Sequence, residues 1–253
     1  MKITKIKIYK SKVSITFDTS KKIDISRDIY PNFYLYEGKE ISKKEFNEIT
    51  SLNNSSKLLQ YALKIRSKAI YSEFQMREKL YKKEATKPEV DKVIKTLKSY
   101  DLINDEAYAL DLCEYYNSLN YGKNKIIRKL SEKGIFEKEI NKIKFPESLE
   151  RKKANNLLPK LEKKYEKYNS SQKKQHIYNA YIQQGFDSDI ASSMINKIKE
   201  SNNKDELEKL KSDYKKAKLR LEKKYKGKEL KQKIIQNLLQ KGYRLNDIMK
   251  IIG

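Results

Sequence analysis

The sequence predicts a mainly α-helical protein made of tandem three-helix repeats in an elongated array, preceded by a small β-rich N-terminal domain. Apolar residues alternate with a period near two in the first 25 residues, and from residue 57 onward they recur at helical spacing. A phrase centred on glycine returns after 51 and 57 residues, from Gly134 to Gly185 and from Gly185 to Gly242. Such periods are typical of repeat arrays, whose units bury their apolar faces against one another.

The N-terminal domain is predicted to span residues 1–55. Residues 3–17 alternate Ile, Val and Phe with Lys, Ser and Thr, which indicates one or two strands with a turn at residues 10–12. The alternation continues through residues 23–25. A capping box at residues 42–45 then opens a short helix, and the Ser/Asn run at residues 51–56 is expected to end it.

The rest of the chain divides into four predicted repeats. In the first, capping boxes at residues 72–75 and 86–89 each open a helix, after an apolar stripe that begins at Leu58. A third short helix in the second repeat carries Ile140 and Ile143. The predicted repeats span residues 56–102, 103–146, 147–201 and 202–253.

The recurring phrases are KLSEKGIFEKEI, AYIQQGFDSDI and NLLQKGYRLNDI. Each combines an apolar residue before a glycine, an apolar residue after it, and an isoleucine four to five residues further on. This order predicts a helix that ends at a glycine in the left-handed conformation, followed by a new helix. The first repeat carries a degenerate copy, with Glu84 and Ala85 in this position.

The fourth repeat begins with apolar residues spaced by three and four between Leu207 and Tyr225. This spacing predicts a seam that packs on the rest of the same repeat. A helix that binds a partner is the alternative.

The charge balance indicates affinity for polyanions. The chain has 58 Lys and Arg against 34 Asp and Glu, a formal net charge of +24. A field of this sign attracts nucleic acid. Only seven of the basic residues are Arg. Because Lys, Asn, Ile and Tyr all have A/T-rich codons, part of the Lys excess can reflect genome composition.

The composition argues against an enzyme and against a cofactor. One cysteine, Cys113, and one histidine, His176, provide neither an intramolecular disulfide nor a His/Cys zinc site. Phosphate-binding and metalloprotease motifs are absent. The acidic pairs at residues 105–106 and 187–189 lie at helix starts, where capping explains them. A metal-dependent nuclease with convergent carboxylates remains an alternative. Without an apolar run long enough to span a membrane, we expect a cytoplasmic protein.

Three phrases, in order over about 80 residues, resemble the RecX family. The first is the stretch from Ala62 to Leu80, with Arg66 followed by Ser72-Glu73-Phe74 and then Lys79-Leu80. The second is Leu102-Ile103-Asn104-Asp105-Glu106 with Tyr108-Ala109, and the third runs from Gly122 through Ile126 and Leu130 to Lys133-Gly134-Ile135. The sequence departs from the family at Glu84-Ala85, where Lys-Gly is usual, at Asn104, where Asp is usual, and at Asn117, where Arg is common.

The resemblance implies a regulator of the RecA recombinase. Proteins of this family are modular three-helix repeats that lie along the groove of the RecA–DNA filament. There they restrain ATP hydrolysis, strand exchange and the coprotease activity behind the SOS response. The expected partners are therefore the RecA filament and single- and double-stranded DNA, bound without sequence preference by a monomer.

Nine basic residues on two repeats are the candidates for contacts with RecA or DNA. Arginine is rare in this chain and forms bidentate pairs with phosphate or carboxylate, which favours the arginines among them. For any single lysine, a solvated cationic surface is the alternative. Tyr121 and Tyr243, beside glycines, are further candidates for stacking on bases. The nine candidates are Arg66, Lys68, Arg77, Lys79, Lys83, Lys125, Arg128, Lys129 and Lys133.

A sequence-independent helical-repeat scaffold for DNA or RNA is the alternative function. Its affinity would depend on salt and on the number of phosphates contacted, whereas a recombinase regulator would prefer the nucleoprotein filament to bare DNA.

Overall fold

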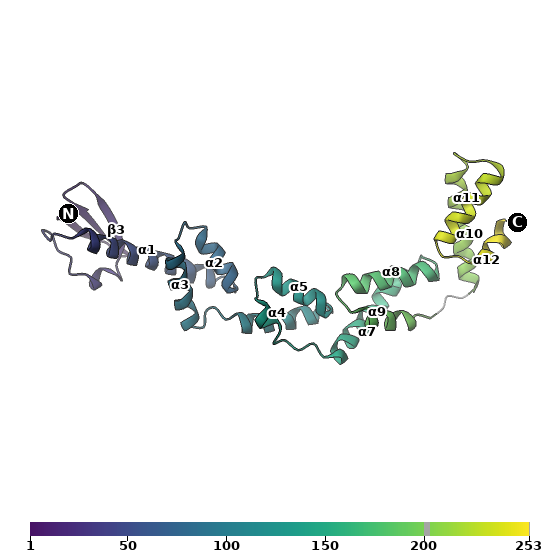
Figure 1. Ribbon diagram of the computed structural model, residues 1–253, viewed down its shortest axis with the longest axis horizontal. Coiled ribbons are helices and arrows are strands. Elements are labelled where there is room, and N and C mark those ends of the chain that lie inside the picture. Colours follow the sequence, from purple (N-terminus) through teal and green to yellow (C-terminus); the bar gives the residue numbers. More distant parts are fainter. Residues whose placement is uncertain (200–202, 253) are drawn as a thin grey trace. The chain divides into compact units, whose positions relative to one another are not determined.

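A computed structural model describes residues 1–199 and 203–252 of the chain. In these residues it contains twelve α-helices and a single sheet of three antiparallel strands at the N-terminus (Figure 1). The predicted class, mainly α with a small N-terminal β-rich part, is confirmed. Internal contacts divide the chain into two compact units, Met1–Asp111 with Leu130–Asn141, and Leu112–Lys129 with Lys142–Gly253.

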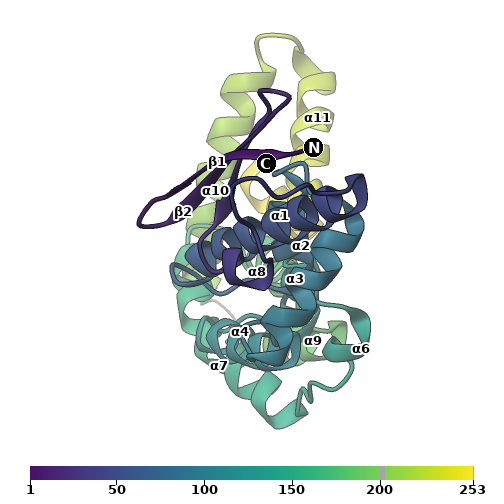
Figure 2. The ribbon, with the colours of Figure 1, turned by 90° about the vertical axis from the view of Figure 1, so that its left-hand side faces the viewer.

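The sheet of the first unit follows directly from the alternating N-terminal sequence. Strands β1 (Ile3–Ile8), β2 (Lys12–Phe17) and β3 (Lys22–Ser26) pair in the order β1-β2-β3, with β1 and β2 forming a hairpin (Figure 2). Val13 lies opposite Ile25 in the β2–β3 register. Both residues are fully buried, because the period of two puts them on the same face of the sheet.

The first helix corrects one prediction. Helix α1 (Lys43–Arg66) opens with the predicted capping box but continues for 24 residues through the Ser/Asn run that was expected to end it. Asn53 explains the difference, because its side chain accepts a hydrogen bond from the N–H of Ser26 and donates one to the carbonyl oxygen of Asp24. The polar run is therefore helical, with Asn53 facing β3. The predicted domain limit at residue 55 falls inside this helix.

The helices that follow begin where the capping signals predict. Capping boxes at Ser72 and Thr86 open α2 and α3. In the second predicted repeat, the third helix ends at Ile140, so Ile143 lies outside it, contrary to the prediction. The bounds are α2 (Glu73–Tyr81), α3 (Lys87–Ser99), α4 (Asp105–Ser118), α5 (Lys123–Glu132) and α6 (Glu137–Ile140).

The second unit contains six further helices. In α10, Leu210 and Ala217 are buried against Ile234 and Leu238 of α11. The seam therefore packs within its own repeat, as predicted. The bounds are α7 (Glu147–Lys164), α8 (Ser170–Gln183), α9 (Ser188–Asn196), α10 (Asn203–Leu221), α11 (Gly227–Gln240) and α12 (Leu245–Ile252).

A common core pattern surrounds the residue that ends α2, α5, α8 and α11. That residue is left-handed in all four cases, and three times it is glycine as predicted, while Glu84 adopts a φ of 58° after α2. The residues four and eight positions before it are buried in every case. They are Met76 and Leu80, Ile126 and Leu130, Ile177 and Tyr181, and Ile234 and Leu238.

Each of the three glycines also packs against the start of an earlier helix. A Cβ added to Gly134 would lie 2.6 Å from the Cβ of Phe74 in α2, and one added to Gly185 would lie 2.8 Å from the Cα of Lys125 in α5. One added to Gly242 would lie 2.7 Å from the Cβ of Ser171 in α8. Since real Cβ atoms do not approach so closely, glycine is required here for packing as well as for its positive φ.

A carboxylate completes each of these three junctions. The N–H of Glu73, at the start of α2, donates to Asp105 (2.8 Å). Lys123, at the start of α5, donates in the same way to Glu150 (3.1 Å). The N–H of Ser170, at the start of α8, donates to Glu206 (2.9 Å). The first N–H groups of a helix have no partner inside it, so a carboxylate from two helices further along the chain satisfies one and interacts favourably with the helix dipole.

The junction at α5 contains a buried ion pair. Glu150 and Lys153 of α7 are 4% and 2% exposed, and Lys153 Nζ lies 2.5 Å from Glu150 Oε1. The same ammonium donates to the Asn117 side chain and to the carbonyl oxygen of Tyr121, both at 2.7 Å. Complete satisfaction of its hydrogen bonds is what makes a charge tolerable in the interior.

The division of the helical part into four repeats stays a prediction. Its last limit, between residues 201 and 202, lies outside the described residues. In the part that is described, the junctions at α2, α5 and α8 follow the predicted succession of the repeats.

Glu150→Ala should open the second junction locally. It removes the acceptor of the Lys123 N–H and leaves the Lys153 ammonium buried without its counter-ion, which costs about 3–5 kcal/mol. Hydrogen exchange of the α5 and α7 amides should accelerate accordingly. Glu147→Ala, on the same helix, removes only an exposed pair with Arg151 and should change exchange little. Equal exchange in the two variants would contradict this role of Glu150.

Asp105 should respond differently to removal of its charge and of its acceptor. Burial raises the pKa of the Asp105 carboxyl, and the Glu73 N–H only partly opposes this. A carboxyl whose pKa is raised by folding stabilises the fold when protonated, and that contribution is lost as the pH rises through the folded pKa. Asp105→Asn should therefore be at least as stable as the parent at pH 7, with the advantage disappearing below about pH 4.

Asp105→Ala, which lacks the acceptor, should be less stable at both pH values. Thermal melts at pH 7 and pH 4 measure the difference, and equal destabilisation by Asn and Ala at pH 7 would contradict the prediction.

Candidate nucleic-acid interface

The second-repeat candidates include a cluster of cations on one face of α5, which we call the α5 basic cluster and define as Lys125, Arg128 and Lys129. The pKa of Lys125 is lowered, first by burial and then by the positive charges of Arg128 and Lys129. These residues are therefore close enough to repel one another, as their spacing of three and four predicts. A bound anion would relieve that repulsion.

Lys125 is held in place by neutral partners. Its Nζ donates to the side chain of Gln184 at the end of α8 (2.7 Å) and lies 3.8 Å from the centre of the Tyr121 ring. The ring and the amide orient the ammonium and leave its charge unneutralised. The cluster is thus anchored at the α5 junction by residues of the second unit.

Lys133 is half-buried at the first junction. Its backbone carbonyl oxygen accepts a hydrogen bond from the Ser72 hydroxyl (2.6 Å), which links the end of α5 to the start of α2. The position thus has a structural role in addition to any contact made by its side chain.

The first-repeat arginines are bound to other parts of the protein. Arg66 Nε donates to the carbonyl oxygen of Leu102 (2.7 Å). Arg77 pairs with Glu73 (2.7 Å) and with Asp91 (2.5 Å). Structural roles therefore explain in part why these two positions carry arginine. The spacing of four between Glu73 and Arg77 was the signal in the sequence for the second of these.

The first-repeat lysines Lys68 and Lys83 are exposed, and Lys79 is half-buried like the two arginines. Lys68 follows α1 and is exposed. The ammonium groups of Lys79 and Lys83 lie 4.7 Å and 4.9 Å from the ring centres of Tyr71 and Tyr61. These cation–π contacts orient the two ammonium groups, and an aromatic ring does not neutralise their charge.

One of the two tyrosine predictions is wrong. Tyr243 is 8% exposed, its hydroxyl donates to Asp213 (3.0 Å), and burial raises the pKa of its phenol. It fills the core after Gly242 and presents no face to a base. Tyr121 is half-buried and stacks on Tyr116 at 5.9 Å.

The acidic residues act mainly in junctions. Asp187 was expected to cap its own helix, but its carboxylate makes no cap in α9 and accepts instead from Asn124 in α5 (2.7 Å). No group of three or more His, Cys, Asp or Glu side chains in residues 1–199 and 203–252 could hold a metal ion. Cys113 is buried, as expected. In the same described part, no helix is long and apolar enough to cross a membrane.

Known proteins resemble the chain over its whole length. Regulatory protein RecX of Streptococcus sanguinis is 30% identical, covering 98% of this chain and 97% of the relative. The RecX protein of Listeria welshimeri is 28% identical, covering 100% and 96%. No protein-family model matches the chain.

Solved structures share the fold. A crystal structure of regulatory protein RecX superposes with a TM-score of 0.64 at 24% identity, covering 78% of this chain and 99% of that one. The RecX structure from Lactobacillus salivarius gives 0.54 at 25% identity, covering 57% and 96%. Together with the near-complete coverage of the curated relatives, these likenesses establish that the protein belongs to the RecX family of regulatory proteins.

Proposed function

We propose that this protein regulates the RecA recombinase by binding along the RecA–DNA filament. There it restrains ATP hydrolysis, strand exchange and the coprotease reaction of the SOS response, and so acts in homologous recombination and DNA repair. Membership of a family of regulatory proteins, over the whole chain, is the observation that carries this proposal. The net charge of +24 supports a polyanionic partner. The role needs no catalysis and no cofactor, and assumes a cytoplasmic monomer.

The four predicted repeats give this protein several points at which it can contact the filament. The junctions at α2, α5 and α8 are built alike, because at each one the first N–H of the helix donates to a carboxylate of a later helix. Successive repeats are therefore joined by the same kind of contact. A ligand of linked modules gains avidity when the filament offers matching sites in succession. Weak contacts of individual repeats can therefore add up to tight binding of a filament.

The α5 basic cluster is the strongest part of the proposed contact surface. Repulsion among its cations makes it favourable to bind phosphate or carboxylate oxygens. Lys68, Lys79 and Lys83 extend the proposed surface in the first repeat. Arg66 and Arg77 support it through their ties to Leu102, Glu73 and Asp91.

Arg128→Glu combined with Lys129→Glu should weaken this regulation. In a titration of RecA-catalysed ATP hydrolysis on single-stranded DNA, the parent protein should inhibit at well below one molecule per RecA protomer. The double variant should need at least tenfold more protein, since it loses two cations and adds two anions at the cluster. Melting temperature verifies that the variant is folded.

Lys215→Glu combined with Lys216→Glu is the matched control. It makes the same charge change on an exposed part of α10 and should inhibit nearly as well as the parent. Equal loss in both variants would mean that net charge, and not the α5 basic cluster, determines the effect.

A sequence-independent nucleic-acid scaffold is the second candidate, favoured by the high net charge. It would inhibit RecA only when it coats the free DNA, and excess bare DNA would abolish inhibition. Affinity for bare DNA would then account for the whole effect. The logarithm of the binding constant would fall linearly with the logarithm of the salt concentration.

A further inference from the structure

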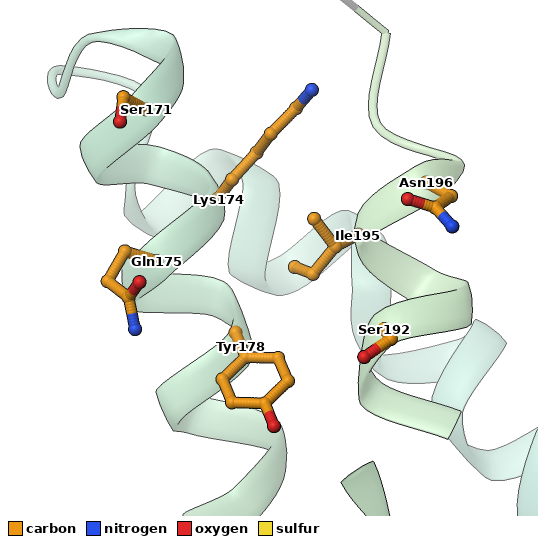
Figure 3. A pocket seen from close by; sticks show the side chains of 7 residues that line it. All are labelled: Ser171, Lys174, Gln175, Tyr178, Ser192, Ile195 and Asn196. Carbon is orange, nitrogen blue, oxygen red and sulfur yellow. The ribbon is translucent and has the colours of Figure 1, made fainter. Parts of the chain in front are cut away.

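A groove of about 330 Å³ lies between α8 and α9 in the second unit. The residues that line it on α8 are spaced by three and four, and so are those on α9, so each helix contributes one face. The lining includes Lys174, Gln175 and Tyr178 on α8 and Ser192, Ile195 and Asn196 on α9. Figure 3 shows Lys174 and Tyr178 on the side of α8 that faces Ile195 of α9, whereas the Gln175 side chain points away from α9.

The groove combines an apolar centre with a cation and a phenol on α8, while the Gln175 amide, which also lines it, donates to the side chain of Asn179 (3.1 Å). The Ile195 side chain lies between the helices, with the Lys174 ammonium above it and the Tyr178 ring below it in the view of Figure 3. Neither the Lys174 ammonium nor the Tyr178 hydroxyl has a hydrogen-bond or ion-pair partner within residues 1–199 and 203–252. The Tyr178 ring packs partly on the repeat core, which fixes its orientation.

The corresponding groove of the first repeat is closed by ion pairs. Counted back from the left-handed residue, Glu73 and Arg77 of α2 occupy the positions of Lys174 and Tyr178. Glu73 pairs with Lys98 of α3, and Arg77 pairs with Asp91 of α3. In the third repeat these two positions carry a cation and an aromatic ring, and the lining residues of α9 are uncharged. Two salt bridges thus connect α2 and α3 in the first repeat, whereas a groove lies between α8 and α9 in the third.

We propose that this groove binds one nucleotide of single-stranded nucleic acid. The base packs between the Tyr178 ring and Ile195, and the Lys174 ammonium pairs with a backbone phosphate. The Ser192 hydroxyl and the Asn196 amide meet the edge of the base. Stacking of this kind tolerates any base, because every base has a π-face. The inference deepens the proposed function, on which it rests for the nature of the partner.

The chemistry of the groove favours a nucleotide over an acidic peptide. A peptide rich in carboxylates would need several cations, and Lys174 is the one charged residue among those that line the groove. An aromatic ring beside an aliphatic side chain, with one cation within reach, matches one base and one phosphate.

Photocrosslinking tests the inference directly. The full-length protein is irradiated with an oligothymidylate that carries a single 5-iodo-deoxyuridine, and the crosslinked peptide is identified by mass spectrometry. The peptide that contains Tyr178 should be the principal product, and unmodified oligothymidylate should compete for it. Crosslinks that occur only outside α8 and α9 would overturn the inference.

Matched variants separate stacking from charge. Tyr178→Leu should weaken oligothymidylate binding about tenfold in fluorescence anisotropy, and Tyr178→Phe should bind like the parent. Tyr34→Leu removes a tyrosine that is 91% exposed in the N-terminal region and should have little effect. Lys174→Ala should lower the salt slope by about one phosphate. Lys160→Ala, an exposed lysine of α7, should lower it less.

The outcomes distinguish this inference from the proposed function. A crosslink at Tyr178 together with no effect of the parent protein on RecA would support the groove and reject the regulatory role. Inhibition of RecA that is unchanged by Tyr178→Leu, with no crosslink, would do the reverse. Protection of α8 and α9 from hydrogen exchange by polyglutamate, but not by oligothymidylate, would assign the groove to an acidic protein and overturn the inference.

Discussion

The architecture depends on a general property of helices, namely that their first N–H groups lack partners within the helix. At the starts of α2, α5 and α8, a carboxylate of a later helix satisfies one of these groups, and a left-handed glycine of a later helix packs against the same turn. A helix start is thus completed only by the helices that follow it. The dependence of each helix start on later helices joins small helical units, which have small cores of their own.

The same arrangement determines where charge can be left unneutralised. At the α5 junction, the Lys153 ammonium pairs with the buried Glu150 and donates to Asn117 and Tyr121, while Lys125 is oriented by the neutral side chain of Gln184. The interior charges are paired within the junction, and the Lys125 ammonium beside it is held by an amide and a ring that carry no charge. The first repeat shows the opposite choice, because Arg77 is neutralised by two carboxylates. Repeats with the same core can therefore differ in what their surfaces bind.

Much of the fold could be predicted from local sequence. The main error of that prediction, the end of the first helix, has a physical cause. Alternation, capping boxes and glycine phrases are local signals, and they located the strands, the helix starts and the helix ends. The Ser/Asn run in α1 was misjudged because Asn53 is stabilised by hydrogen bonds to β3, which are not visible in a local pattern. The partners of Arg66 and the burial of Tyr243 likewise depend on residues 30 or more positions away. The α5 basic cluster could be predicted because helical spacing alone brings its members together.

The first repeat differs from the others at the residue that makes a junction possible. At the other three sites a Cβ on the left-handed residue would come within 3 Å of the start of another helix, and glycine avoids this contact. Glu84 occupies this position after α2 with the same backbone conformation but with a Cβ. It cannot approach the start of a helix as the glycines do. The first repeat therefore lacks the glycine contact that the other three left-handed residues make with the start of an earlier helix.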